Sequence, residues 1–249
     1  HPWATGNLSG QFDDLRGIPV LQGIHEAGGT HGGHPQREER MGLDRLVESV
    51  PDRPAGLDHL FDHPAVRSAY ASDEYIPYWA DLWPAAIMLG EVVLAEPWEG
   101  RGKQLEALEF GCGLGISGMV ALSRGLHVTF SDVDEAAVQL AAANARLNGF
   151  THFETAAIDL RATPERQFPV LLAADVCYEL RLTEAVVQFV KGSLAPGGLA
   201  LLTDTDRYSA RPLRHLLERE GLNVVVSPMK AGLQGSVQKG FLYRITHRD

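Results

Sequence analysis

Three glycines, Gly111, Gly113 and Gly115, follow a short apolar run and precede a stretch with helical character. Glycines at a turn between a strand and a helix let a ligand approach the bare backbone, and the helix N-terminus offers free amide groups. A second apolar run, residues 127–131, ends in Asp132, seventeen residues after Gly115. A carboxylate there can accept hydrogen bonds from both hydroxyls of a ribose. The spacing therefore predicts a site for a ligand that carries a nucleoside.

The glycine pattern alone leaves two cofactor classes open. Residues 113–118 fit G-x-G-x-x-G, the fingerprint of folds that bind NAD, and a lone match of this kind is a weak signal. Glu109 lies two residues before the first glycine, where its carboxylate would face the pyrophosphate of NAD and be repelled by it. The same carboxylate would favour the ammonium group and the positively charged sulfur of S-adenosylmethionine (SAM). We therefore expect SAM as the cofactor and keep an NAD-linked oxidoreductase as a distant alternative.

An aromatic stretch lies upstream of the glycines. Residues 75–83 contain two tyrosines and two tryptophans, and Pro84 then suits the first position of a helix. The aromatic side chains either anchor an N-terminal segment to the core or form a wall of the cofactor pocket. In the second interpretation, Trp79 and Trp83 pack against the adenosyl or cationic methyl group. Both interpretations can hold together.

The elements that must position these residues alternate along the chain. The predicted strands are 105–110, 127–131, 153–158, 169–174, 199–203, 223–227 and 240–245. The predicted helices are 84–96, 116–124, 135–148, 183–194 and 210–220, with a weaker one near 163–167. We expect an α/β fold with a doubly wound, seven-stranded, mostly parallel, Rossmann-like sheet. The last two strands have no helix between them and should form an antiparallel C-terminal hairpin, and a helical extension should precede the sheet.

In such sheets the ligand lies outside the carboxyl ends of the strands. Asp159 and Asp175 each follow a predicted strand, as does the polar segment 203–206. Asp159 would accept a hydrogen bond from the adenine amino group, or it is a solvated loop residue. Asp175 begins the sequence Asp175-Val-Cys-Tyr178, which would lie where an acceptor enters.

The sequence E-F-G-C-G-L-G at 109–115, together with Asp132, resembles motif I and the following acidic motif of class I SAM-dependent methyltransferases. Asp175-x-x-Tyr178 and the P-Y-W-A-x-L-W-P-A-A stretch at 77–86 resemble the seven-strand protein lysine methyltransferases. That family includes the enzymes that act on the electron-transfer flavoprotein β subunit, elongation factors and chaperones. The resemblance covers about residues 75–249.

This resemblance implies methyl transfer from SAM to a lysine side chain of a protein. Asp175 and Tyr178 would be the catalytic residues. The positions implied to bind the cofactor are Trp79, Trp83, Glu109, Gly111, Cys112, Gly113, Gly115, Asp132 and Asp159. A small-molecule amine, hydroxyl or thiol stays open as the acceptor, and a non-catalytic SAM-fold binding module is a distant alternative.

Composition bounds the remaining properties. The 249 residues carry a formal net charge of −10, which argues against a broad nucleic-acid surface. Two cysteines give no disulfide framework, and we expect no metal, no membrane segment, a cytoplasmic location and a monomer by default. We predict a flexible tail at 1–40, a helical cap at 41–97 and the SAM-binding methyltransferase domain at 98–249.

Overall fold

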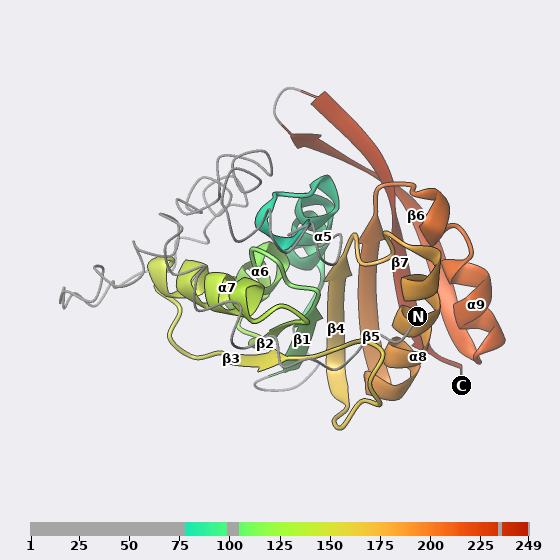
Figure 1. Ribbon diagram of the computed structural model, residues 1–249, viewed down its shortest axis with the longest axis horizontal. Coiled ribbons are helices and arrows are strands. Elements are labelled where there is room, and N and C mark those ends of the chain that lie inside the picture. The colour runs from blue at the N-terminus through green and yellow to red at the C-terminus, as the bar shows by residue number, and fades with distance from the viewer. Residues whose placement is uncertain (1–77, 99–104, 234–235, 249) are drawn as a thin grey trace, which may run out of the picture.

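Apolar strands and helices alternate along the chain. The computed structural model, which describes residues 78–98, 105–233 and 236–248, arranges them as one seven-stranded sheet with helices on both faces (Figure 1). The strands are β1 (Glu106–Phe110), β2 (His127–Asp132), β3 (Glu154–Ala157), β4 (Phe168–Ala174), β5 (Leu194–Asp204), β6 (Leu222–Leu233) and β7 (Ser236–His247). The helices are η3 (Tyr78–Ala80), α5 (Pro84–Ala95), α6 (Ile116–Ser123), α7 (Glu135–Leu147), α8 (Leu180–Ser193), η4 (Tyr208–Ala210) and α9 (Leu213–Arg219).

The strand order in the sheet is β3-β2-β1-β4-β5-β7-β6. Strands β1 to β5 pair in parallel, whereas β7 lies antiparallel between β5 and β6. The chain order reverses direction in the sheet between β1 and β4, which creates the crevice where ligands of such folds bind. The predicted doubly wound sheet with an antiparallel C-terminal hairpin is therefore confirmed.

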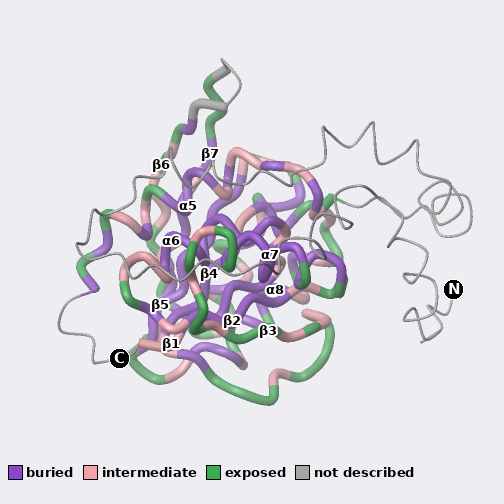
Figure 2. The backbone as a smooth tube through the Cα atoms, turned by 90° about the vertical axis from the view of Figure 1, so that its left-hand side faces the viewer, coloured by how far each residue is buried: buried purple, intermediate pink, exposed green. Residues whose placement is uncertain are grey.

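Strand alternation divides the core between the two faces of the sheet. In β1, Leu108 and Phe110 pack with the layer of α8 and α9, while Ala107 packs with the layer of α5, α6 and α7. Strands β4 and β5 alternate in the same way, whereas β2 contributes Val128 and Phe130 to the layer of α5, α6 and α7. The buried residues consequently follow the central strands and the inner sides of the helices (Figure 2).

Helix α5 belongs to this core. It begins at Pro84, ends at Ala95 before Pro97, and buries Met88, Leu89 and Val93 against the sheet. The described part of the predicted 41–97 cap is thus one of the helices that cover the sheet. The predicted tail at 1–40 and the rest of the cap, up to residue 77, lie outside the described residues.

Two predicted elements differ from the observed ones. Residues 163–167 form no helix, because the stretch is too short to nucleate and contains Pro164. Strands β6 and β7 each run for twelve residues, well beyond the predicted 223–227 and 240–245. Their last five residue pairs, from Met229–Gly240 to Leu233–Ser236, extend past the point where β5 stops pairing with β7 at Asp204. The hairpin therefore projects beyond the rest of the sheet (Figures 1 and 2).

None of the described helices has the length and apolar character needed to cross a bilayer.

Candidate functional site

The glycine loop lies between β1 and α6. Gly111, Gly113 and Gly115 have φ values of 61°, 48° and 77°, a region that residues with a side chain rarely adopt. A Cβ at Gly113 would lie 3.1 Å from the backbone oxygen of Trp79, and a Cβ at Gly111 would lie 2.6 Å from Val176 Cγ1. The loop therefore requires glycine for its conformation and for the close approach of its neighbours.

Asp132 ends β2 beside this loop. Its Oδ2 accepts a hydrogen bond from the Gly113 amide at 3.2 Å, and its Oδ1 accepts one from the Asp134 amide at 3.2 Å. Burial raises the pKa of Asp132 to about 6. Each carboxylate oxygen has a second lone pair, so the side chain can still receive the two hydroxyls of a ribose.

Glu109 is fully enclosed between β1 and α6. Its place in β1 turns the side chain toward the face that α6 covers, and only 4% of the residue is exposed. Burial raises its pKa to about 8, although the hydrogen-bonding groups of Gly118 and Ser117 act in the opposite direction. Its Oε2 has no hydrogen-bond partner among the described residues. At pH 7 the side chain is therefore mostly protonated, whereas our sequence argument treated it as an anion.

Asp175 follows β4 at the same edge of the sheet. Its φ of 53° is a strained value for a residue other than glycine. Oδ1 accepts hydrogen bonds from the Thr205 amide at 3.1 Å and the Thr205 hydroxyl at 3.0 Å, and Arg207 Nε lies 3.3 Å away. Oδ2 is buried and has no partner among the described residues. One oxygen is thus held in place, while the other is buried without a partner among the described residues.

An aromatic row lies beside Asp175. The Tyr178 ring lies 5.5 Å from the Tyr78 ring, which lies 6.2 Å from the Trp83 ring. Arg207 lies at the Trp83 end of this row, with its guanidinium carbon 5.1 Å from the centre of the Trp83 ring. Tyr178 keeps 43% of its surface exposed, and burial of the rest raises the pKa of its hydroxyl.

The structure also describes the surroundings of three other predicted residues. Asp159 is engaged in an ion pair with Arg161 at 2.6 Å, which lowers the pKa of Asp159. Trp79 contributes its backbone oxygen to the wall behind Gly113. Cys112 is buried and donates its amide to the Ser131 carbonyl at 2.9 Å, so its side chain faces the core.

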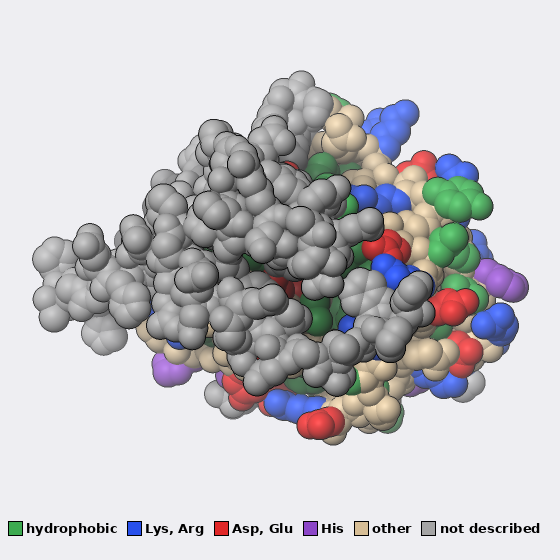
Figure 3. All heavy atoms as spheres, viewed as in Figure 1, with side chains coloured by type: hydrophobic (Ala, Val, Ile, Leu, Met, Phe, Trp, Pro, Cys, Tyr) green, Lys and Arg blue, Asp and Glu red, His purple; other side chains and the backbone are tan. Residues whose placement is uncertain are grey.

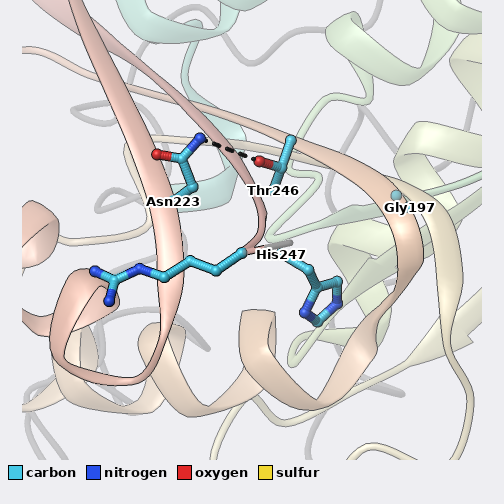
Figure 4. Close-up of a pocket in the computed structure, with 6 residues that line it drawn as sticks. Gly197, Asn223, Thr246 and His247 are labelled. Atoms are coloured by element: carbon cyan, nitrogen blue, oxygen red, sulfur yellow. Dashed lines mark hydrogen bonds between the residues drawn. The ribbon is translucent and has the colours of Figure 1, made fainter.

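Two open hollows lie on the surface formed by the described residues. The larger, of about 460 Å³, lies where β5 begins and β7 ends, and its Asn223 and Thr246 side chains bond to each other at 3.5 Å (Figure 4). It is at the opposite edge of the sheet from the glycine loop, where this fold class does not bind its ligands. The smaller hollow, of about 270 Å³, adjoins the Asp175 site and includes Arg207 in its lining.

Sequence reasoning missed the roles of Tyr78, Thr205 and Arg207. Tyr78 lay within the aromatic stretch, and the segment after β5 was placed at the correct edge. Their contacts with Tyr178, Asp175 and Trp83 join segments up to about 120 residues apart, as the Arg207–Trp83 pair does. Only the folded chain brings them together.

The residues at this edge fit SAM. The glycine loop presents bare backbone at the start of α6, Asp132 suits a ribose, and the buried acidic groups suit a cation. Glu109, near the end of β1, and Asp175, just after β4, each have a buried carboxylate oxygen with no partner among the described residues.

The chain is similar to known methyltransferases. Residues 108–200 match a family described as a methyltransferase domain. The electron transfer flavoprotein β subunit lysine methyltransferase of Rattus norvegicus is 28% identical over 145 residues, which cover 57% of this chain and 56% of the relative. The Mus musculus protein of the same name is 27% identical over the same coverage. The chain thus spans about half the length of these curated relatives.

Solved structures share the fold. The N-methyltransferase NodS from Bradyrhizobium japonicum, solved with S-adenosyl-L-homocysteine (SAH), superposes with a TM-score of 0.51 at 19% identity, covering 83% of this chain and 98% of NodS. A ribosomal protein L11 methylase from Lactobacillus delbrueckii gives a TM-score of 0.52 at 18% identity, covering 65% of this chain and 78% of that one. The predicted fold class is confirmed by this likeness.

Proposed function

We propose that this chain, which carries a SAM-dependent methyltransferase domain of the class I fold, transfers a methyl group to a lysine side chain of a protein. The observation that carries the acceptor class is the placement of Asp175, with one buried oxygen unpartnered, beside the Tyr178, Tyr78 and Trp83 rings. A carboxylate next to aromatic faces suits a cationic or amine-bearing side chain. The relatives named as lysine methyltransferases support the same class.

The cofactor would be held by the glycine loop and Asp132. Gly111, Gly113 and Gly115 provide the cradle, and the free lone pairs of Asp132 accept the ribose hydroxyls. SAM supplies an activated methyl group on a positively charged sulfur. Glu109 lies behind the loop, enclosed between β1 and α6 beside Gly118.

Asp175 captures and orients the acceptor amine. Because Thr205 and Arg207 fix Oδ1, Oδ2 can accept a hydrogen bond from the amine without rotating away. The aromatic row excludes water from the amine and limits its direction of approach.

The proton of the lysine ammonium must leave before the nitrogen can react, because only the neutral amine has a free lone pair. A charged Asp175 alone would favour the ammonium, so the carboxylate is assigned capture and orientation. The poorly hydrated aromatic surroundings lower the pKa of the lysine, and solvent removes the proton before the amine is enclosed.

Transfer of label tests the acceptor class. The full chain is incubated with methyl-labelled SAM and a cell extract, and protein and small molecules are then separated. We expect label in protein, recovered as methyl-lysine after hydrolysis, and loss of this label with Asp175→Asn. The Asp175→Asn variant should still bind SAH, which shows that it is folded. Label found only in small molecules would replace the lysine acceptor with a metabolite.

A further inference from the structure

A row of basic side chains leads away from Asp175 along the projecting hairpin. We call it the basic strip and define it as Arg207, Arg211, Arg214, Lys230 and Lys239. The chain as a whole has a formal net charge of −10, so this basic strip contrasts with the acidic character of the protein. Lys and Arg side chains also appear on the right-hand part of the face shown in Figure 3, interspersed with Asp and Glu.

The three arginines border the smaller hollow. Arg207, Arg211 and Arg214 line it with Asp206, and its apolar part is formed by Val226, Phe241 and Tyr243 from the hairpin. Arg214 is 2.8 Å from Glu218 on the exposed side of α9, while Arg211 lies 5.7 Å from the Tyr208 ring. The arginines thus surround a shallow groove with an apolar floor.

The two lysines continue the same face of the hairpin. Val226 pairs with Tyr243, Pro228 with Phe241, and Lys230 with Lys239, and these pairs are each two residues apart along the strands. Side chains two residues apart in a strand point to the same face. Lys230 and Lys239 therefore lie on the groove side of the hairpin, past the last pairing of β5 with β7.

The positive charges of Lys230 and Lys239 repel each other in the unbound chain. Both lysines are exposed, they lie directly opposite each other, and no ion pair joins either one to a described acidic residue. Like charges directly opposite in a strand pair are destabilising. An anionic partner would offset this cost on binding.

We propose that the basic strip docks an acidic segment of the protein acceptor, next to the lysine that enters at Asp175. The strip begins at Arg207, which contacts both Asp175 and Trp83, so a chain with its lysine at Asp175 passes directly onto the groove. Aspartate and glutamate side chains can each meet one cation of the strip along an extended peptide. Asp206 within the groove disfavours a polyphosphate chain, which carries a negative charge on every unit.

This inference rests on the proposed function, and its test measures binding instead of turnover. Three fluorescent peptides share a central lysine and carry four flanking glutamates, glutamines or lysines on one side. Their affinities for the full chain are measured by anisotropy with saturating SAH. We expect the glutamate peptide to bind roughly tenfold more tightly than the glutamine peptide and the lysine peptide to bind most weakly.

The charge-reversal variant Lys230→Glu/Lys239→Glu should remove the advantage of the glutamate peptide. Lys191→Glu/Arg146→Glu is the control with the same change in net charge: Lys191 on α8 pairs with Glu220, Arg146 on α7 lies over the Phe153 ring, and neither belongs to the strip. The control should retain the preference, and both variants should bind SAH as the unmodified chain does. Equal affinities of the glutamate and glutamine peptides would overturn the proposal, whether or not the chain methylates lysine.

A single-stranded RNA of the same length serves as the competing probe. RNA that binds more tightly than the glutamate peptide, and loses affinity in the lysine charge-reversal variant, would assign the strip to nucleic acid and overturn the proposal. Failure of the unmodified chain to bind SAH would instead contradict the proposed function.

Discussion

At the residue scale, Glu109 combines a role in the fold with a place at the site. Strand alternation turns its side chain toward α6, where Gly118 leaves the necessary space: a Cβ there would lie 2.5 Å from Glu109 Oε2. The carboxyl group is buried, so its charged form is disfavoured until a cation arrives. Burial of Glu109 therefore lowers the free energy of unfolding of the chain at neutral pH.

Glu109→Gln should change how stability depends on pH. The pKa of Glu109 is about 8 in the folded chain, against an ordinary value of 4.5, so between these pH values the folded state holds a proton that the unfolded state has lost. The free energy of unfolding of the unmodified chain consequently falls as pH rises through this window. The glutamine variant lacks this term and should be more stable by about 1–3 kcal/mol at pH 8, with little difference at pH 4.5.

Urea unfolding at the two pH values measures this difference. Burial raises the pKa of Asp132 to about 6 and that of Asp204 to about 7. Both residues therefore also make the free energy of unfolding fall as pH rises, but they are present in both proteins, so their effect cancels in the comparison. An equal stability difference at pH 4.5 and pH 8 would show that Glu109 does not hold its proton in the folded chain.

Asp132 and Asp175 should separate cofactor binding from turnover. Asp132→Ala removes the expected ribose contact and leaves the Gly113 amide unpaired, so SAH affinity should fall by about 2–3 kcal/mol. Asp175→Asn retains the shape of the side chain and should leave SAH affinity within a few-fold, while methyl transfer falls sharply. Calorimetry with SAH and a labelled-methyl assay provide the two measurements, and loss of SAH affinity in Asp175→Asn would contradict the assigned roles.

At the scale of elements, the glycine loop depends on its neighbours. Gly113→Ala places a methyl group 3.1 Å from the Trp79 oxygen and forces a side chain onto a φ of 48°. We expect a loss of stability of about 1–3 kcal/mol and markedly weaker SAH binding. Gly149→Ala is the control, since Gly149 has a φ of 83° but no atom within 4 Å of the added Cβ. It should lose about 1 kcal/mol and keep its SAH affinity; equal effects on SAH affinity would show that the Trp79 contact is unimportant.

The end of α5 is joined to β7 by an ion pair that the sequence does not suggest. Arg244 donates to both oxygens of Glu96, at 2.6 and 3.0 Å, and the Glu96 side chain is 5% exposed. Because a buried partner left alone is costly, Glu96→Gln and Arg244→Met should each destabilise the chain, and the double variant should lose less than their sum. Denaturant unfolding of the four proteins should give a coupling of about 1–3 kcal/mol. Additive losses would indicate that the two side chains act separately.

At the scale of the whole molecule, buried acidic groups gather at the edge that receives the cofactor. Glu109 and Asp132 both have raised pKa values there, so both are partly protonated near neutral pH. A positively charged ligand stabilises their ionised forms, whereas a neutral one does not. SAM differs from SAH by its charged sulfur. The ratio of SAM to SAH affinity should therefore rise by several-fold between pH 6 and pH 9, as measured by calorimetry, and a flat ratio would show that neither carboxylate senses that charge.

The sequence predicts the fold well because the strands are apolar, the helices are amphipathic or apolar, and glycine and proline separate them. It also places Asp132 and Asp175 at the correct edge, since both end or follow parallel strands. It does not predict the protonation of Glu109 or the contact of Arg207 with Trp83, because both follow from packing between distant segments. The hairpin length was missed because glycines at 232, 235 and 240 resemble a long loop.

The central place of β7 has a consequence for synthesis on the ribosome. Strand β6 pairs only with β7, and β5 pairs with β4 on one side and needs β7 on the other, although β7 follows both in the chain. Until β7 has emerged, a nascent chain holds β5 with an open edge and β6 with no partner at all. Strands β1 to β4, which carry the glycine loop, Asp132 and Asp175, would therefore pair before the sheet is complete. During this interval chaperones can bind the unpaired edges of β5 and β6.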